Sequence, residues 1–299
     1  MSRPNLFLPI GILAISTASI FVKLCDAPAL VIATYRMVIS SIVLIPFAGY
    51  QKIWRGLEGS EMGWQFMAGL FLSLHFTFWI ASLKYTSVAS SVVLVTTHPI
   101  FVGLGARLFL KEPLGTPLIL GILLSVLGGG LIGYGDFLLT KEAFLGDGLA
   151  LLGAMSASGY FLVGRKMRRQ QNLLTYIFPV YSTSGLTLVF LSLLFQKTLF
   201  GYTAKTYFFM ILLAFIPQLI GHTTFNWALK YLPASAVAIA ILGEPVGSTV
   251  LAYLILGERL TVLKSLGGVF ILSGILSALT PFPIYRKRRK KENLSRSFI

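Results

Sequence analysis

The sequence repeats itself at a constant offset of 146 residues, and this repeat restricts the fold more than any other feature. The Leu-Lys-Tyr of residues 83–85 recurs at 229–231, and Pro99 recurs as Pro245. The same offset holds without a gap for further pairs: Glu112 and Glu258, Leu114 and Leu260, Gly121 and Gly267, Gly128 and Gly274, and, upstream, Tyr35 and Tyr181. A constant offset across several separate segments indicates an internal duplication.

The composition is that of a polytopic membrane protein. Of the 299 residues, 56% are hydrophobic and 12% are charged, whereas soluble domains carry about 25% charged residues. Apolar segments of about 20 residues can cross a bilayer as helices. The sequence contains ten such segments, separated by short loops that leave no room for a soluble domain: 6–23, 29–50, 63–83, 88–110, 117–135, 146–165, 174–195, 206–229, 234–256 and 263–280.

The distribution of Lys and Arg predicts the orientation of these spans. With the amino terminus in the cytoplasm, seventeen basic residues fall on the inner side and seven on the outer side, as the positive-inside rule requires. Both termini are then cytoplasmic, in what we expect to be a bacterial inner membrane. Five spans per half is an odd number, so the second half, 146–280, is expected to be inverted relative to the first, 6–135. Inverted repeats around a central site are typical of secondary transporters.

The net charge of +15 depends heavily on the carboxyl-terminal tail. Seven of the 25 basic residues lie in the tail segment 284–299, and we interpret it as a cytoplasmic tail against anionic lipid headgroups rather than a nucleic-acid site. The single cysteine, Cys25, excludes an intramolecular disulfide and a cysteine-rich metal site. The first apolar segment is longer than the apolar core of a signal peptide, so we expect it to be retained as a transmembrane span.

Glu244 is the leading functional candidate, because it lies near the middle of the apolar stretch 234–260 and precedes Pro245. A carboxylate at that depth costs at least about 2.5 kcal/mol and should face protein, water or ligand. Pro245 has no N–H and leaves the carbonyl of Ile241 free, so a helix break is expected there. Glu244 could bind a cation or proton during transport, or it could be a structural acid that caps the break or pairs with a base.

His98 and Arg36 are the corresponding candidates in the first half. His98 occupies the position equivalent to Glu244 and precedes Pro99, the second predicted helix break. It could relay protons, since histidine titrates near neutrality, or simply pack in the bundle. Arg36 is expected about 10 Å below the outer surface. It could bind a substrate carboxylate, neutralise Glu244, or extend to the interface.

Polar residues also recur along two other spans. Gln218, His222 and Asn226 are spaced by four, which places them on one helical face. They could line a cavity or hydrogen-bond neighbouring helices as packing contacts. His75 and Trp79 form a similar pair, in which Trp79 could stack on a ligand or belong to the outer aromatic belt.

The weaker candidates for a cavity are Tyr35, Tyr160 and Tyr181. The glycines of 128–133 fit a nucleotide-binding pattern, but they lie in an apolar helix without a preceding strand. We interpret them, with Gly121, as sites of close helix approach. No phosphate loop, nucleophile elbow or metal-binding motif is recognised, so no metal, cofactor or enzymatic activity is expected.

The chain resembles the EamA-type transporters of the drug/metabolite transporter superfamily over about residues 6–280. The motifs that carry the resemblance are His98-Pro99 with 111–114 (Lys-Glu-Pro-Leu), Glu244-Pro245 with 256–260 (Leu-Gly-Glu-Arg-Leu), and 34–36 (Thr-Tyr-Arg). The resemblance implies an all-α membrane protein of ten helices in two inverted repeats around a central cavity, and transport without ATP hydrolysis. It departs at His98, where many members have another residue.

Together these observations predict a secondary transporter of a small metabolite, with amino acids or related amphipathic compounds leading, and proton coupling as a candidate. Import and export are both compatible with the sequence. Two other classes are weighed against it: a membrane enzyme that uses Glu244 and His98 as an acid–base pair, and a channel or scaffold. The internal inversion and the charged groups at mid-depth favour the transporter.

Overall fold

The computed structural model describes residues 3–50, 59–111, 115–134, 141–258 and 262–279. These residues form helices and short connections, with no strand among them. The predicted tail 284–299 lies outside them, as do Glu112, Leu114 and Leu260 of the repeat. The elements in chain order are α1 (Arg3–Ser16), α2 (Ala18–Leu24), α3 (Ala29–Tyr50), α4 (Gly59–Tyr85), α5 (Val88–Val95), α6 (His98–Phe109), α7 (Thr116–Tyr134), α8 (Lys141–Arg168), α9 (Leu173–Leu194), α10 (Ala204–Leu213), the π-helix η2 (Ala214–His222), α11 (Thr223–Ala228), α12 (Ala234–Ile241), α13 (Gly243–Leu251), the π-helix η3 (Ala252–Leu256) and α14 (Val262–Leu279).

Seven helical segments among the described residues are long and apolar enough to cross a bilayer, and they mark the chain as an integral membrane protein. They are Phe7–Leu24, Ala29–Gly49, Glu61–Tyr85, Val88–Phe109, Leu173–Leu194, Ala204–Ala228 and Ala234–Leu256. Large apolar side chains such as Leu108, Phe109 and Leu186 point outwards from the bundle, as lipid-facing residues do. The remaining predicted spans correspond to α7, α8 and α14.

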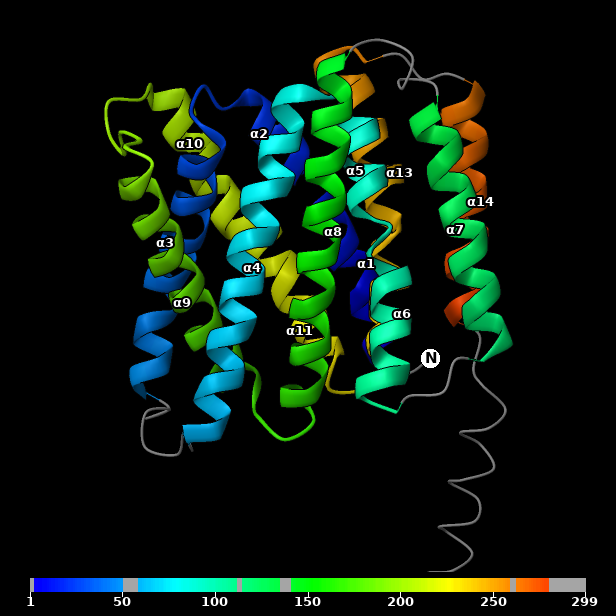
Figure 1. Cartoon of the computed structure of the whole chain (residues 1–299), viewed down its shortest axis with the longest axis horizontal. Helices are drawn as coiled ribbons and strands as arrows, with labels where there is room; N and C mark the ends of the chain where they lie inside the picture. Colours follow the sequence, from blue (N-terminus) through cyan, green and yellow to red (C-terminus); the bar gives the residue numbers. More distant parts are fainter. Residues whose placement is uncertain (1–2, 51–58, 112–114, 135–140, 259–261, 280–299) are drawn as a thin grey trace, which may run out of the picture.

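Helices α7 and α14 lie side by side at one edge of the molecule (Figure 1). A Cβ atom on Gly128 would meet the backbone of Gly267 and lie 2.8 Å from the Cβ atom of Phe270, and one on Gly274 would lie 2.7 Å from the Gly121 carbonyl oxygen. The contacts pair residues in opposite order along the two helices, so α7 and α14 are antiparallel. Small residues allow this close approach, as the glycine pattern predicts.

The first span is interrupted at Thr17, between α1 and α2, and two further spans are broken near their middle. The first of these two breaks lies at Thr96 and Thr97, between α5 and α6, and the second lies at Leu242, between α12 and α13. Each break therefore precedes its proline, Pro99 or Pro245, which occupies the first turn of the following helix, where its missing N–H removes no helical hydrogen bond. The half-helices pack crosswise: α5 contacts α13, and α6 contacts α12.

The span from Ala204 to Ala228 is continuous but not uniformly α-helical. Its middle part, η2, is a π-helix that contains Pro217 and ends at His222. A π-helical segment within an α-helix is uncommon and occurs frequently at functional sites. Here it brings Gln218 and His222 to the centre of the bundle, against α1, α3 and α10.

Candidate functional site

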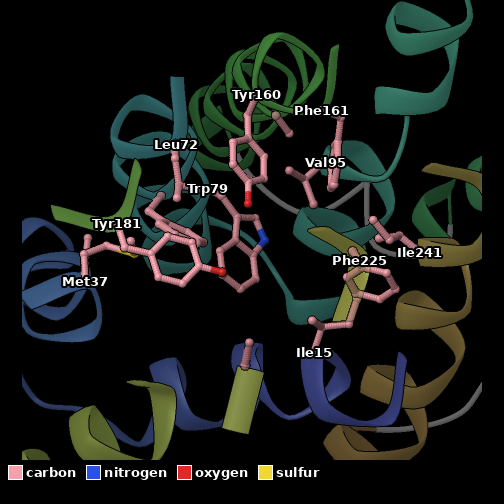
Figure 2. Packing of buried hydrophobic residues seen from close by; sticks show 14 of the residues in the cluster. Ile15, Met37, Leu72, Trp79, Val95, Tyr160, Phe161, Tyr181, Phe225 and Ile241 are labelled. Atoms are coloured by element: carbon pink, nitrogen blue, oxygen red, sulfur yellow. The ribbon is translucent and has the colours of Figure 1, made fainter. Parts of the chain in front are cut away.

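The breaks and the π-helix surround a small cavity in the middle of the bundle. Both halves of the chain line it: the first half contributes residues of α1 to α6, and the second half residues of α8, η2, α11, α12 and α13. Water centres can occupy about 30 Å³ of it, which is room for two or three water molecules. Figure 2 shows the Tyr160 hydroxyl and the Trp79 indole turned towards the same space, with Phe225 and Ile241 facing them.

All three histidines of the protein, His75, His98 and His222, line this cavity. The Nδ1 atoms of His75 and His98 lie 3.0 Å and 3.2 Å from the carbonyl oxygens of Gly153 and Val95. Because a carbonyl only accepts hydrogen bonds, both rings carry their proton on Nδ1, and Nε2 of the neutral ring is an acceptor. The Val95 carbonyl, at the end of α5 just before the break, thus orients His98.

Arg36 enters the cavity from α3, and only 1% of its surface is exposed. Its Nε donates to Oε1 of Gln218 at 2.9 Å, and its guanidinium carbon lies 4.0 Å from the centroid of the Phe76 ring, a cation–π contact. Both terminal nitrogens, Nη1 and Nη2, are buried without a hydrogen-bond partner. The alternative in which Arg36 extends to the membrane interface is therefore wrong.

Glu244 lies in the first turn of α13 and also lines the cavity. A helix amino terminus favours a negative charge at this position. Among the described residues, its carboxylate has no hydrogen bond and no ion pair within 4.0 Å. Arg36 and Glu244 thus line one cavity without forming an ion pair.

The polar stripe of the eighth span divides between two roles. His222 lines the cavity, with its ring edge on against Phe76 at 5.3 Å between centroids. Gln218 and Asn226 are fully buried and hydrogen-bond side chains of the cavity wall. Gln218 accepts from Arg36, and Nδ2 of Asn226 donates to the hydroxyl of Tyr160 at 2.5 Å. Both alternatives predicted for the stripe, cavity lining and helix–helix contact, therefore occur within it.

The remaining candidate residues lie at different distances from the cavity. Trp79 is 3% exposed and stacks on His75 at the cavity wall, so its assignment to the outer aromatic belt is wrong. Tyr181 lies next to the site and hydrogen-bonds Thr223 at 3.2 Å. Tyr35 is separate from it: its hydroxyl donates to the carbonyl oxygen of Leu199 at 2.9 Å.

Three contributors to the site were not predicted from the sequence. The Phe76 ring packs against the Arg36 guanidinium, and Phe161 stacks on His98 at 5.6 Å between ring centroids. The π-helix η2 positions His222 at the cavity. Isolated phenylalanines in an apolar span give no signal, whereas Pro217 within the eighth span was a visible sign of irregular helix. No cluster of three or more metal-ligating side chains is found in the part of the chain that the structure describes.

Comparison with known proteins agrees with this architecture. The model of the EamA-like transporter family matches residues 3–134 and 144–280. An uncharacterized transporter of Bacillus subtilis, YdfC, is 28% identical over 249 residues, which cover 82% of this chain and 79% of that protein. An uncharacterized transporter of Archaeoglobus fulgidus is 24% identical over 285 residues, covering 92% and 96%. A solved crystal structure matches with a TM-score of 0.75 at 19% identity, covering 93% of this chain and 96% of the other. The chain belongs to the EamA-like transporter family.

Proposed function

We propose that the protein is a secondary active transporter of small metabolites, with amino acids or related amphipathic compounds as its most suitable substrates. One observation carries the proposal: a cavity at the centre of a membrane bundle is lined by Arg36, whose two terminal nitrogens have no hydrogen-bond partner, and by Glu244, whose carboxylate has no ion pair among the described residues. Buried charges are costly inside a membrane protein and mark substrate or ion sites.

The proposed architecture has ten transmembrane helices in two inverted five-helix repeats, 6–135 and 146–280. The antiparallel packing of α7 on α14 supports the inversion, because Gly121 and Gly128 correspond to Gly267 and Gly274 at the 146-residue offset. The crosswise contacts of the broken helices support it too. In such carriers the two repeats move relative to each other and open the central site alternately to either side.

The lining residues divide into expected roles. Glu244 and His98 are candidates for proton coupling and cation binding, Arg36 for binding an anionic group, and His222 and Trp79 for contact with the substrate body. His75 is positioned by Gly153 and stacks on Trp79. Gln218 and Asn226 orient the wall, and Pro99 and Pro245 start the half-helices that carry His98 and Glu244.

We place both termini in the cytoplasm of a bacterial inner membrane, from the seventeen-to-seven distribution of basic residues. The basic tail would then contact anionic lipid headgroups, and no nucleic-acid binding is proposed. We propose transport rather than an enzymatic activity, in keeping with the match to a transporter family, and we propose no cofactor or metal.

Uptake into proteoliposomes tests the function directly. A mixed metabolite panel, which includes amino acids, is offered to vesicles with and without an imposed pH gradient. We expect selective accumulation that the gradient alters and that empty vesicles lack. Chemical conversion of a panel member would support the enzyme alternative, and flux that never exceeds the gradient of the solute would support a channel.

A further inference from the structure

We infer that the cavity is built for a zwitterion with an apolar body, whose carboxylate binds Arg36 and whose ammonium group binds Glu244. This inference rests on the proposed transport function and deepens it, because it specifies both ends of the substrate. It comes from the way in which hydrogen-bond donors and acceptors without partners are distributed around the cavity.

The donor side comes from α3 and α4. Arg36 is fixed on one side by Gln218 and on one face by Phe76, so its two free nitrogens, Nη1 and Nη2, form the part of the guanidinium that remains available. This pair of donors fits the two oxygens of a carboxylate. Nε1 of Trp79, a group that can only donate, is also buried without a partner.

The acceptor side comes from α6 and α13. Nε2 of His98 is buried without a partner, and the Nδ1 contact with the Val95 carbonyl makes it an acceptor. The Glu244 carboxylate, 8% exposed, has no partner among the described residues. A protonated amine carries three donors and a positive charge, and it would satisfy both groups.

Apolar side chains complete the wall of the cavity. Ile15, Val95, Phe225 and Ile241 line the cavity and offer no polar group to a substrate. Water centres can occupy only about 30 Å³ of the cavity, so we expect the site to widen when a substrate enters. A substrate with charges at both ends of its polar part and a hydrocarbon side chain matches this arrangement, whereas a second charge on the side chain would be buried unpaired.

The competing explanation is that Arg36 and Glu244 serve only as an internal charge pair. The two explanations differ in their prediction for a double variant. If the residues only neutralise each other, Arg36→Gln and Glu244→Gln should each lower thermal stability, and the double variant should recover it. If each binds its own substrate group, the double variant should bind substrate no better than either single variant.

The experiment measures binding to the purified full-length protein in lipid nanodiscs, by isothermal titration calorimetry and by thermal shift. The probes are leucine, leucinamide, which lacks the carboxylate, N-acetylleucine, which lacks the ammonium, and isoamylamine; valine and phenylalanine are added as second zwitterions. We expect leucine to bind at least about 10-fold more tightly than each of its one-charge analogues, a difference of about 1.4 kcal/mol.

The variants assign each end of the ligand. Arg36→Gln should lose the discrimination between leucine and leucinamide, and Glu244→Gln the discrimination between leucine and N-acetylleucine. Arg107→Gln and Glu142→Gln are matched controls, because these side chains are exposed away from the cavity, and both should bind as the unmodified protein does. Equal binding of leucine and leucinamide, or recovery of both stability and binding in the double variant, overturns the inference.

A complete lack of binding by leucine, valine and phenylalanine also overturns the inference. If the metabolite panel still reveals uptake of another solute, the proposed transport function stands while the zwitterion site is wrong. If neither binding nor uptake is found, the transport function itself fails.

Discussion

Glu244 and Arg36 are charged side chains that share a cavity without touching. Removing an ion from water into a protein interior costs several kcal/mol unless its surroundings compensate for it. Here the compensation is partial, since Arg36 keeps one hydrogen bond and one aromatic face, and Glu244 keeps the favourable dipole of α13. At the scale of single residues, the site therefore holds unsatisfied charge that a substrate or proton can satisfy.

Replacing Glu244 by glutamine removes the charge while it keeps the shape of the side chain. We expect Glu244→Gln to fold normally and to reduce transport at least about 10-fold, or about 1.4 kcal/mol in the controlling step. If Glu244 is the proton site, the variant should also lose the pH dependence of uptake. The other ionisable groups on the cavity are Arg36, Tyr160 and the three histidines, His75, His98 and His222. His98→Gln should shift the pH dependence without abolishing it. Uptake by proteoliposomes across a pH series is the measurement, and normal uptake by Glu244→Gln at every pH would make Glu244 a structural residue.

His222 and Asn226 lie one helical turn apart and should respond differently to replacement by leucine. The Nδ1 atom of His222 has no hydrogen bond to lose, so His222→Leu should lower transport and leave detergent melting nearly unchanged. Asn226→Leu removes the donor to Tyr160 and Tyr181 and should lower stability by about 1 to 3 kcal/mol. Comparison of melting curves and specific uptake separates the two effects, and a large loss of folded His222→Leu protein would contradict a cavity role.

At the scale of elements, the half-helices form the central site, whereas the α7–α14 pair contributes to packing. The breaks between α5 and α6 and between α12 and α13 bring two helix starts, with His98 and Glu244, to the centre. The α7–α14 pair lies at the edge of the bundle (Figure 1), and none of its described side chains lines the central cavity. Its contribution is packing, and its contact depends on glycine.

Valine substitutions in α7 test that contact. A side chain at Gly128 would collide with α14, since its Cβ atom would lie 2.8 Å from that of Phe270, whereas Gly130 has nothing within 4 Å. Gly128→Val should destabilise the protein by about 1 to 3 kcal/mol, as overpacking does. Gly130→Val, in the same helix, controls for helix propensity and should melt close to the unmodified protein. Equal melting temperatures for the two variants would mean that the close approach of α7 and α14 is not required.

At the scale of the whole molecule, cysteine labelling tests the predicted orientation of the protein in the membrane. Single cysteines at Gln170 and Lys197, both exposed and at opposite ends of α9, report it through an impermeant maleimide. Cys25 can stay in place, because it is 3% exposed and burial raises the pKa of its thiol to about 12. At neutral pH it is therefore protonated, and thiols react through the thiolate. We expect labelling of position 197 from outside and of position 170 only in inverted vesicles.

Further positions extend this test to the first half and the ends. Position 56 and the tail are predicted inside, and position 140 outside; all three lie outside the described residues. Labelling of positions 170 and 197 from the same side, or of the tail from outside, would contradict both the orientation and the count of ten spans.

The sequence by itself determined the helical membrane class, the limits of the apolar segments and the duplication. These properties are readable because a bilayer imposes length and hydropathy on each span separately. It also supplied polar candidates, since an ionisable residue in a span is rare enough to stand out. Glu244, Arg36 and all three histidines stand out in this way, and all five line the cavity.

Only the tertiary structure decided which candidates belong together. Tyr35 and Arg36 are neighbours in sequence, yet Tyr35 binds Leu199 while Arg36 enters the cavity with Gln218, 182 positions away along the chain. Phe76, Phe161 and the π-helix at Ala214–His222 became part of the site only through packing. Local patterns fix which face of a helix is polar, but the partner of that face depends on contacts between residues far apart in sequence. Those contacts brought unpartnered donors of α3 and α4 and unpartnered acceptors of α6 and α13 to one cavity.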